Sequence, residues 1–160
     1  MSKVTPFLWF DGDAEAAATL YVSLFPNSRI TSVSRYSANT PGEPGAVMTV
    51  AFELDGAAWT ALNGGPMYRF TEAVSFSISC DSQAEVDHYW DGLLAGGGEP
   101  GQCGWLKDRF GLSWQVVPKR LGELMGGPDR AAAGRVAQAM MKMTRLDVAA
   151  LEAAALSPAD

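Results

Sequence analysis

The stretch SFSISCDSQAEVDHYW, residues 75–90, carries two periodicities in succession. Up to Cys80, apolar residues alternate with serines, which is the period of two that is typical of a β-strand. Ser82 and Glu85 then form the capping-box pattern S-x-x-E, and Asp81 stands beside it where a carboxylate favours a helix start. The stretch therefore predicts a short strand, a polar break and an amphipathic helix.

The same order of elements occurs near the start of the chain, in TPFLWFDGDAEAAATLY, residues 5–21. Asp11 or Asp13 can cap the alanine-rich helix predicted there. The segments LDGAAWTAL (54–62) and RFGLSWQVV (109–117) also match, because each has a glycine turn that leads into a tryptophan-bearing strand. These ordered matches predict an internal duplication. The corresponding pairs are Thr5 and Ser75, Leu8 and Ile78, Asp11 and Asp81, Gly56 and Gly111, Trp59 and Trp114, and Thr60 and Gln115.

Two further strands are predicted in the first half, at Ile30–Tyr36 and Val47–Leu54. The Pro/Gly-rich segment SANTPGEPGA between them is either an ordinary hairpin connection or a flap over a cavity. The second half is shorter, so it has a trimmed loop or has lost a strand. After Pro118 the chain becomes rich in Ala and Met at helical spacing, which predicts a helical tail that packs on the body or on a partner subunit.

Composition limits the partners that the protein can have. The net charge is −6 and Lys and Arg form no cluster, so nucleic acid is not an expected partner. We expect no membrane partner either, because no apolar run is long enough to span a bilayer. Cys80 and Cys103 form no CxxC motif, which is consistent with reduced thiols and predicts a cytoplasmic location. The single histidine, His88, lies mid-helix, where a surface or packing role is expected.

These motifs resemble the vicinal oxygen chelate superfamily of glyoxalases, bleomycin-resistance proteins and extradiol dioxygenases. Within it they resemble the PhnB-like branch, which often carries the label 3-demethylubiquinone-9 3-methyltransferase. The resemblance runs from Val4 to Pro118 and is strongest in DRFGLSWQVVP. It implies an α+β fold in which paired βαβββ modules form a curved, incomplete barrel around a cavity. We expect a single domain over residues 1–160, with module 1 at about 4–65, module 2 at about 72–118 and the helical tail at about 119–157.

The resemblance also implies which side chains face the cavity. One face of each strand packs on the helices and the other lines the cavity, so the serines of residues 75–80 face the cavity while Trp59 and Trp114 face the core. Asn63 is read as either a turn residue or a ligand contact, and Cys103 as either a small buried thiol or a thiolate nucleophile with Lys107 and Arg109 close in sequence. The residues predicted to contact a ligand are Phe7, Trp9, Thr60, Asn63, Ser75, Ser77, Cys103, Trp105 and Gln115.

Metal-dependent relatives hold a divalent ion with His, Gln or Glu side chains. By resemblance the ligand positions fall at Thr5 or Pro6, Thr60, Ser75 and Gln115. Hydroxyls are poor ligands for a catalytic transition metal, so we expect no metal site. We also expect no S-adenosylmethionine site and no other cofactor, because the turn after FLWF holds one glycine rather than a glycine-rich loop.

The sequence thus predicts a small-molecule binding protein of the glyoxalase/bleomycin-resistance fold, with a compact ligand. Homodimers are common in the family, so a homodimer is expected. An enzyme of the same fold stays open as an alternative, with metal-assisted lyase, isomerase or dioxygenase chemistry or the methyl transfer that the label names. A third alternative is an interaction domain that uses the tail as its contact surface.

Overall fold

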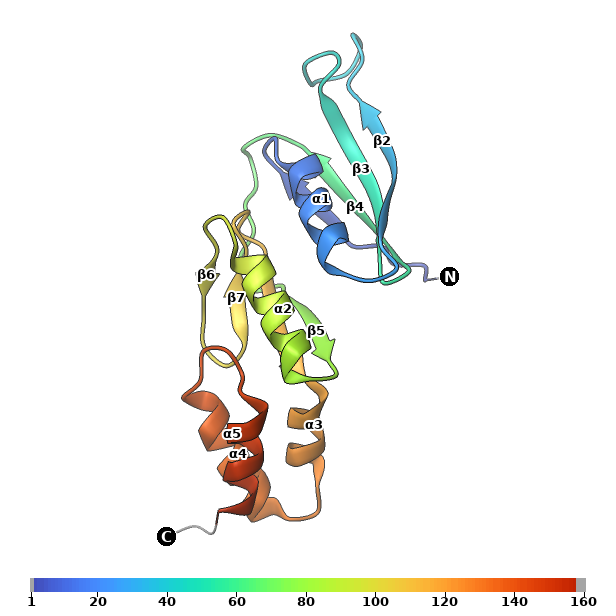
Figure 1. The fold of residues 1–160 in the computed structure, drawn as a ribbon. Coiled ribbons are helices and arrows are strands. Elements are labelled where there is room, and N and C mark those ends of the chain that lie inside the picture. Colours follow the sequence, from blue (N-terminus) through green and yellow to red (C-terminus); the bar gives the residue numbers. More distant parts are fainter. Residues whose placement is uncertain (1, 158–160) are drawn as a thin grey trace. The chain divides into compact units, whose positions relative to one another are not determined.

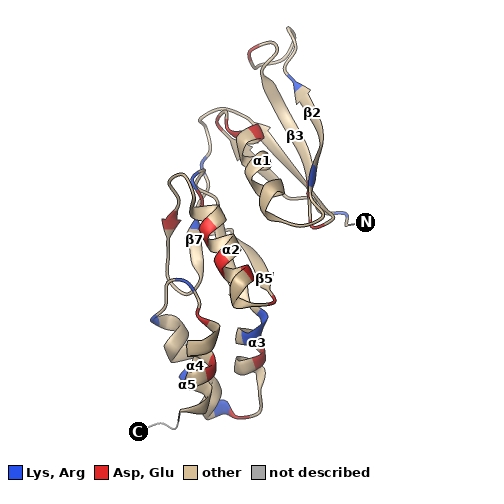
Figure 2. Ribbon diagram, viewed as in Figure 1, with Lys and Arg blue, Asp and Glu red and all other residues tan. Residues whose placement is uncertain are grey.

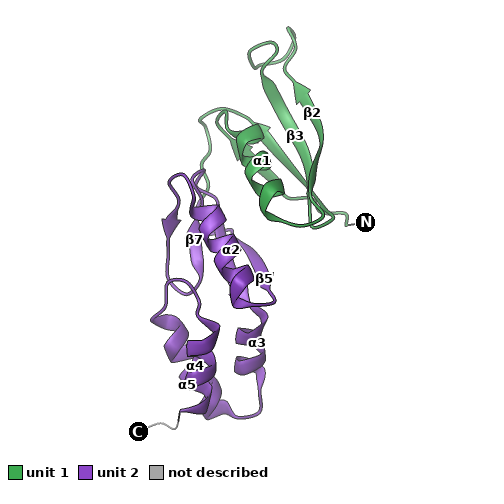
Figure 3. Ribbon diagram, viewed as in Figure 1, with its two compact units in different colours: residues 1–70 green, residues 71–160 purple. Residues whose placement is uncertain are grey.

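The computed structural model describes residues 2–157 and divides into two compact units, residues 1–70 and residues 71–160 (Figures 1 and 3). Each unit begins with the order strand, helix, strand, strand, strand. The elements of unit 1 are β1 (Phe7–Phe10), α1 (Ala14–Leu24), β2 (Arg29–Arg35), β3 (Val47–Leu54) and β4 (Ala57–Asn63). Those of unit 2 are β5 (Phe76–Cys80), α2 (Gln83–Leu94), β6 (Glu99–Pro100), β7 (Trp105–Lys107), β8 (Ser113–Pro118), α3 (Lys119–Gly126), α4 (Arg130–Met141) and α5 (Val148–Leu156).

Strand pairing confirms the predicted βαβββ duplication. The order is β1-β4-β3-β2 in unit 1 and β5-β8-β7-β6 in unit 2, and in both the first strand runs parallel to the last. Phe7 pairs with Thr60 in unit 1, and Ser77 pairs with Gln115 in unit 2. Thr60 and Gln115 are partners in the sequence alignment of the halves. The two halves therefore share their register as well as their order of elements.

The shorter second half keeps its middle strands but trims them. β6 has 2 residues and β7 has 3, whereas β2 has 7 and β3 has 8. Pro100 ends β6, and proline cannot donate a hydrogen bond to a sheet ladder, so it suits this edge position. The shortening therefore falls on the edge of the sheet away from β5.

The core of unit 1 lies between α1 and one face of its sheet. Leu8, Phe10 and Phe52 are buried on that face, and α1 presents to it a run of buried small residues that ends at Tyr21. The rings of Tyr21 and Phe52 have centroids 6.4 Å apart. Full burial of one such large side chain stabilises the fold by about 1.5–3 kcal/mol, so this face fixes which side of the sheet the helix covers.

In unit 2 the equivalent face is closed by Trp114, which is buried to 2% exposure. Its indole Nε1 donates to Asp108 Oδ2 at 2.9 Å. Asp108 Oδ1 accepts from the backbone N–H groups of Phe110 and Leu112. The aspartate thus shapes the turn before β8 while also satisfying the buried indole.

The helical tail, α3 to α5, packs on the rest of unit 2. Its buried residues Leu121, Val136, Leu146 and Leu151 form one cluster, which Met140, Met143 and Val117 of β8 cover. Asp147 caps α5, because its Oδ1 accepts from Ala150 N at 3.0 Å. The Met residues at helical spacing are thus packing residues. Within residues 2–157, no helix has both the length and the apolar character needed to cross a membrane.

Charged residues are distributed unevenly over the elements. Figure 2 shows acidic residues succeeding one another along α2, where Glu85, Asp87 and Asp91 lie. Lys and Arg, by contrast, are dispersed over the elements of both units (Figure 2).

Candidate ligand-binding site

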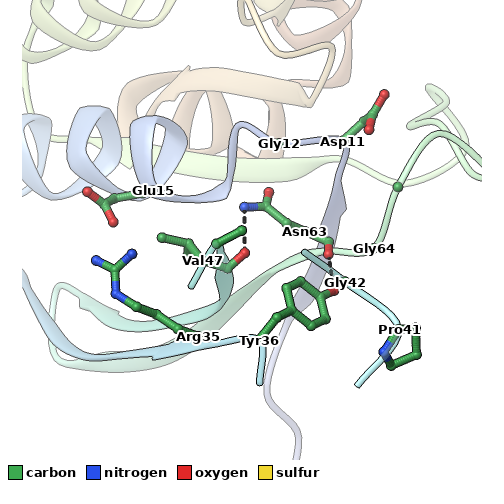
Figure 4. A pocket seen from close by; sticks show the side chains of 12 residues that line it. Asp11, Gly12, Glu15, Arg35, Tyr36, Pro41, Gly42, Val47, Asn63 and Gly64 are labelled. Carbon is green, nitrogen blue, oxygen red and sulfur yellow. Dashed lines mark hydrogen bonds between the residues drawn. The ribbon is translucent and has the colours of Figure 1, made fainter. Parts of the chain in front are cut away.

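A pocket of about 630 Å³ opens in unit 1, beside the start of α1 (Figure 4). Its walls come from the end of β1, the first turn of α1, the loop between β2 and β3, and the end of β4. The volume lies within the range of roughly 300–1,000 Å³ that is typical of small-molecule sites. The lining residues are Asp11, Gly12, Glu15, Arg35, Tyr36, Pro41, Gly42, Ala46, Val47, Asn63, Gly64 and Gly65.

Asn63 organises this pocket. Its Oδ1 accepts from Ala14 N at 2.9 Å and its Nδ2 donates to Val47 O at 3.1 Å. Its backbone oxygen accepts from Tyr36 Oη at 2.5 Å. Asn63 pairs with Phe10 in the β1–β4 register, so its side chain lies on the helix-covered face of the sheet. The residue therefore ties the start of α1, the start of β3 and the end of β2 to one point.

The loop between β2 and β3 is closed on Tyr36. Tyr36 N donates to Ala46 O at 2.9 Å, and Gly45 N donates to Tyr36 O at 2.9 Å. Gly42 lies directly against the tyrosine ring, where any Cβ would overlap ring atoms. The loop that was read as a connection or a flap is thus folded around an aromatic ring at the pocket wall.

Two opposite charges project into the pocket. Figure 4 shows the Arg35 guanidinium and the Glu15 carboxylate pointing toward one another from β2 and α1, whereas Asp11 points away. Arg35 Nη1 donates to Gly45 O at 3.1 Å, which holds the guanidinium at the loop. Among residues 2–157, no ion pair joins Arg35 to Glu15. Both charges are therefore available to a third group.

Sequence reasoning missed Glu15, Arg35 and Tyr36. The signal for Arg35 and Tyr36 is their position at the end of a strand, directly before the Pro/Gly loop. Arg35 and Glu15 are far apart in the sequence, so only the sheet register and the position of α1 bring them together.

Three of the predicted contacts share the face of sheet 1 that α1 leaves uncovered. Phe7 pairs with Thr60, and Trp9 lies on the same side, opposite to the buried Leu8. Trp9 Nε1 donates to Gly65 O at 2.9 Å, and its ring meets the Tyr68 ring edge-on at 4.8 Å. The 64–68 segment therefore holds the Trp9 indole in place. Asn63 is on the other face, so the structure separates it from this set.

In unit 2, four predicted contacts lie together on the face that α2 leaves uncovered. Ser77 and Trp105 both pair with Gln115 in the sheet register. Gln115 Nε2 donates to Ser75 Oγ at 3.0 Å, which satisfies one of the hydroxyls. Cys103 lies apart from them in the turn before β7, with φ +58° and its N–H donating to Met143 O at 2.8 Å. Its role in the structure is to join this turn to the tail.

Two buried polar side chains in unit 2 differ in their environment. The Ser113 hydroxyl, at the start of β8, is buried and has no hydrogen-bond partner within the described part of the chain. Cys80 is buried on the helix face of β5, and this desolvation, followed by the nearby Glu85 charge, raises the pKa of its thiol to about 12. The Cys80 thiol is therefore protonated at neutral pH and unsuited to nucleophilic chemistry.

The positions that correspond to the superfamily's metal ligands do not fit a transition metal. Thr60 and Ser75 offer hydroxyls, and Gln115 offers an amide that already donates to Ser75. Imidazole and carboxylate are the usual ligands of such ions. Over residues 2–157, His, Cys, Asp and Glu form no group of three or more that could hold a metal ion.

The strand order and the repeated βαβββ units define the vicinal oxygen chelate fold. Residues 2–117 match the family model of 3-demethylubiquinone-9 3-methyltransferase, and the chain belongs to this family. The PhnB protein of Bacillus cereus is similar, with 34% identity, a TM-score of 0.67, and coverage of 73% of this chain and 99% of that one.

More distant solved structures share the fold. Protein PA1353 from Pseudomonas aeruginosa has 20% identity and a TM-score of 0.61, with 74% of this chain and 98% of that chain covered. The fosfomycin resistance protein FosX from Listeria monocytogenes, complexed with Mn(II) and sulfate, has 15% identity and a TM-score of 0.50, with 73% and 89% covered. No curated protein matches the sequence.

Proposed function

We propose that this protein binds a small molecule, and that the pocket beside the start of α1 is a binding site for it. The observation that carries this proposal is the pocket itself, whose volume of about 630 Å³ suits a small ligand. Arg35 and Glu15 supply placed charges, and Tyr36 and Val47 supply apolar surface. A few fixed polar groups within apolar walls are the usual composition of a ligand site.

The pocket walls are tied to one another by hydrogen bonds and close packing, which supports binding over an incidental surface hollow. Asn63 makes hydrogen bonds to three separate segments, and Tyr36 is held by its hydroxyl and by the packed Gly42. A ligand that enters preorganised walls loses less free energy to the ordering of the protein.

We further propose that the helix-free faces of the two sheets contact ligand, each within its own unit. In unit 1 the contacts are Phe7, Trp9 and Thr60, an aromatic surface with one hydroxyl. In unit 2 the contacts are Ser75, Ser77, Trp105 and Gln115, and Cys103 contributes from the turn before β7. On this proposal Trp9→Ala and Gln115→Ala weaken binding by several-fold with little loss of stability, which calorimetric titration of each variant tests.

Metal-assisted catalysis is the alternative that the fold suggests, since FosX is complexed with Mn(II). The residues of this chain do not fit that chemistry, because the carried-over positions hold hydroxyls and one amide. Elemental analysis of the purified protein tests this point. A stoichiometric divalent ion that survives dialysis would favour the catalytic alternative over metal-free binding.

Methyl transfer is the alternative that the family description names. The usual S-adenosylmethionine enzyme has a doubly wound parallel sheet with a glycine-rich turn after its first strand. Here each sheet has one parallel pair, and Asp11-Gly12-Asp13 follows β1, so these residues do not fit that site. Saturable binding of S-adenosylmethionine in calorimetry would favour methyl transfer.

We also propose that the protein is a cytoplasmic homodimer. Support comes from exposed apolar side chains in unit 1, with Val4 at 79%, Phe7 at 61% and Met67 at 73% exposure, which a second copy of the chain would cover. The two free cysteines are consistent with a reducing compartment. Sedimentation analysis tests the dimer, because a monomer at all concentrations contradicts it.

Native mass spectrometry of the gently purified protein tests the binding function. We expect a reproducible mass increment on part of the wild-type protein that collapses to the apo mass on unfolding. Arg35→Gln should lose the increment. Arg29→Gln should keep it, because Arg29 lies at the other end of β2 and pairs with Glu53. Equal retention in both variants would contradict binding in this pocket.

A further inference from the structure

We infer that the pocket beside α1 recognises a zwitterion of the α-amino acid class, with an apolar or aromatic side chain. This inference rests on the proposed binding function and specifies its ligand class. The juxtaposition that carries it is that of Arg35 and Glu15, two opposite charges that face the same pocket without forming an ion pair.

Arg35 is the group that receives a carboxylate. Its guanidinium is anchored by one hydrogen bond, from Nη1 to Gly45 O at 3.1 Å. Arginine carries five N–H donors in a fixed fork, so the others can meet the two oxygens of a carboxylate. Figure 4 shows this fork pointing into the pocket toward α1.

Glu15 is the group that receives an ammonium. It lies in the first turn of α1, where the helix dipole favours a carboxylate. The other acid of the lining, Asp11, points away from Arg35, so Glu15 is the acidic group that faces the guanidinium (Figure 4). A simple anion would meet Glu15, and a simple cation would meet Arg35, so each would bear one like-charge contact.

The remaining walls define the rest of the ligand. Tyr36, Pro41 and Val47 line the pocket with ring and methyl surface. Such surface favours an apolar body beside the two charged groups. A compact amino acid with an aromatic side chain satisfies both requirements.

Three probes of similar size test the inference: L-phenylalanine, 2-phenylethylamine and 3-phenylpropanoate. The second lacks the carboxylate and the third lacks the ammonium. An exposed charge pair contributes up to about 1 kcal/mol, so we expect L-phenylalanine to bind about fivefold more tightly than either analogue in NMR titration at low salt. The pocket backbone amides near Gly45 and Glu15 should shift.

Two variants assign each charge to its residue. In Arg35→Gln, L-phenylalanine should bind no better than 2-phenylethylamine, because the carboxylate has lost its partner. In Glu15→Gln, it should bind no better than 3-phenylpropanoate. Arg29→Gln is the control on the same strand and should leave all three affinities unchanged.

Equal affinity of the three probes, or no binding of L-phenylalanine, overturns the inference. Either result leaves the proposed function to be decided by native mass spectrometry, which uses no added probe. The opposite combination is also informative. If wild-type protein shows no mass increment but binds the three probes in the predicted order, the inferred ligand class stands and the protein carries no resident ligand.

Discussion

Asn63 Oδ1 accepts a hydrogen bond from Ala14 N at 2.9 Å, so the first helix is capped from the end of β4. Asp13, the residue at the capping position, makes no side-chain hydrogen bond to the helix. The first backbone N–H groups of a helix have no acceptor within the helix. An acceptor that comes from a distant strand couples formation of the helix to formation of the sheet. The same asparagine also builds the pocket, so local folding and the proposed site share one residue.

Replacing Asn63 should therefore cost more stability than replacing Asp13. Asn63→Ala loses the contact to Ala14 and the one to Val47 O, and we expect a loss of about 2 kcal/mol in the free energy of unfolding. Asp13→Ala should cost about 0.5 kcal/mol or less, through the helix dipole alone. Urea denaturation measures both. A larger effect at Asp13 would show that the aspartate is the true cap.

The buried turn at Asp108 gives a second stability prediction. Asp108→Ala leaves the Trp114 indole N–H and two backbone N–H groups without their acceptor, so we expect a loss of about 3 kcal/mol. Asp91→Ala is the matched control, because its side chain is 73% exposed and its contact to Arg145 is 3.7 Å long. Thermal unfolding measures both variants. An equal fall in the unfolding temperature of the two would contradict the role of Asp108 as the buried acceptor of these N–H groups.

Replacing Ser113 should raise the stability of the protein rather than lower it. Its buried hydroxyl has no partner within residues 2–157, and burying an unsatisfied polar group costs about 1–3 kcal/mol. Ser113→Ala should therefore stabilise the protein by about 1 kcal/mol. Ser77→Ala, at an exposed position of the neighbouring strand β5, should change stability by less than about 0.5 kcal/mol. A destabilised Ser113→Ala protein would mean that the hydroxyl has a partner after all.

The Cys80 thiol predicts a loss of stability at alkaline pH. Its pKa is raised from 9.0 to about 12 in the folded protein, chiefly by desolvation. The unfolded chain therefore releases this proton first, so the contribution is fully present below about pH 9 and is lost as pH rises toward about 12. Urea titrations across this window should show a steeper decline for wild type than for Cys80→Ala. Parallel declines would contradict the burial of the thiol.

The fold was predictable because its signals are local and occur twice. The alternation in residues 75–80, the capping box at Ser82 and the glycine turns before Trp59 and Trp114 each act over a few residues. Matching the halves aligned Thr60 with Gln115, and these two positions hold the same register in their sheets. The family resemblance, now supported by the match over residues 2–117, supplied the architecture.

The pocket beside α1 was not predictable in the same way. Arg35 lies at the end of β2, where the β2–β3 register shifts between Ser34 and Arg35, an irregularity that the sequence pattern does not mark. Asn63 falls on the helix side of β4 by the parity of its strand, which separates it from the other predicted contacts. The same parity places Ser77, Trp105 and Gln115 on one face of the sheet in unit 2.

A high-resolution crystal structure of the protein, purified without added ligand, is the most direct test of the binding site. The proposed function predicts continuous non-protein density between the Arg35 guanidinium and the Glu15 carboxylate, next to the Tyr36 ring. It also predicts that crystals of Arg35→Gln lack this density under the same conditions. Separate water molecules in the pocket of the wild-type protein, or identical density in the variant, would contradict it.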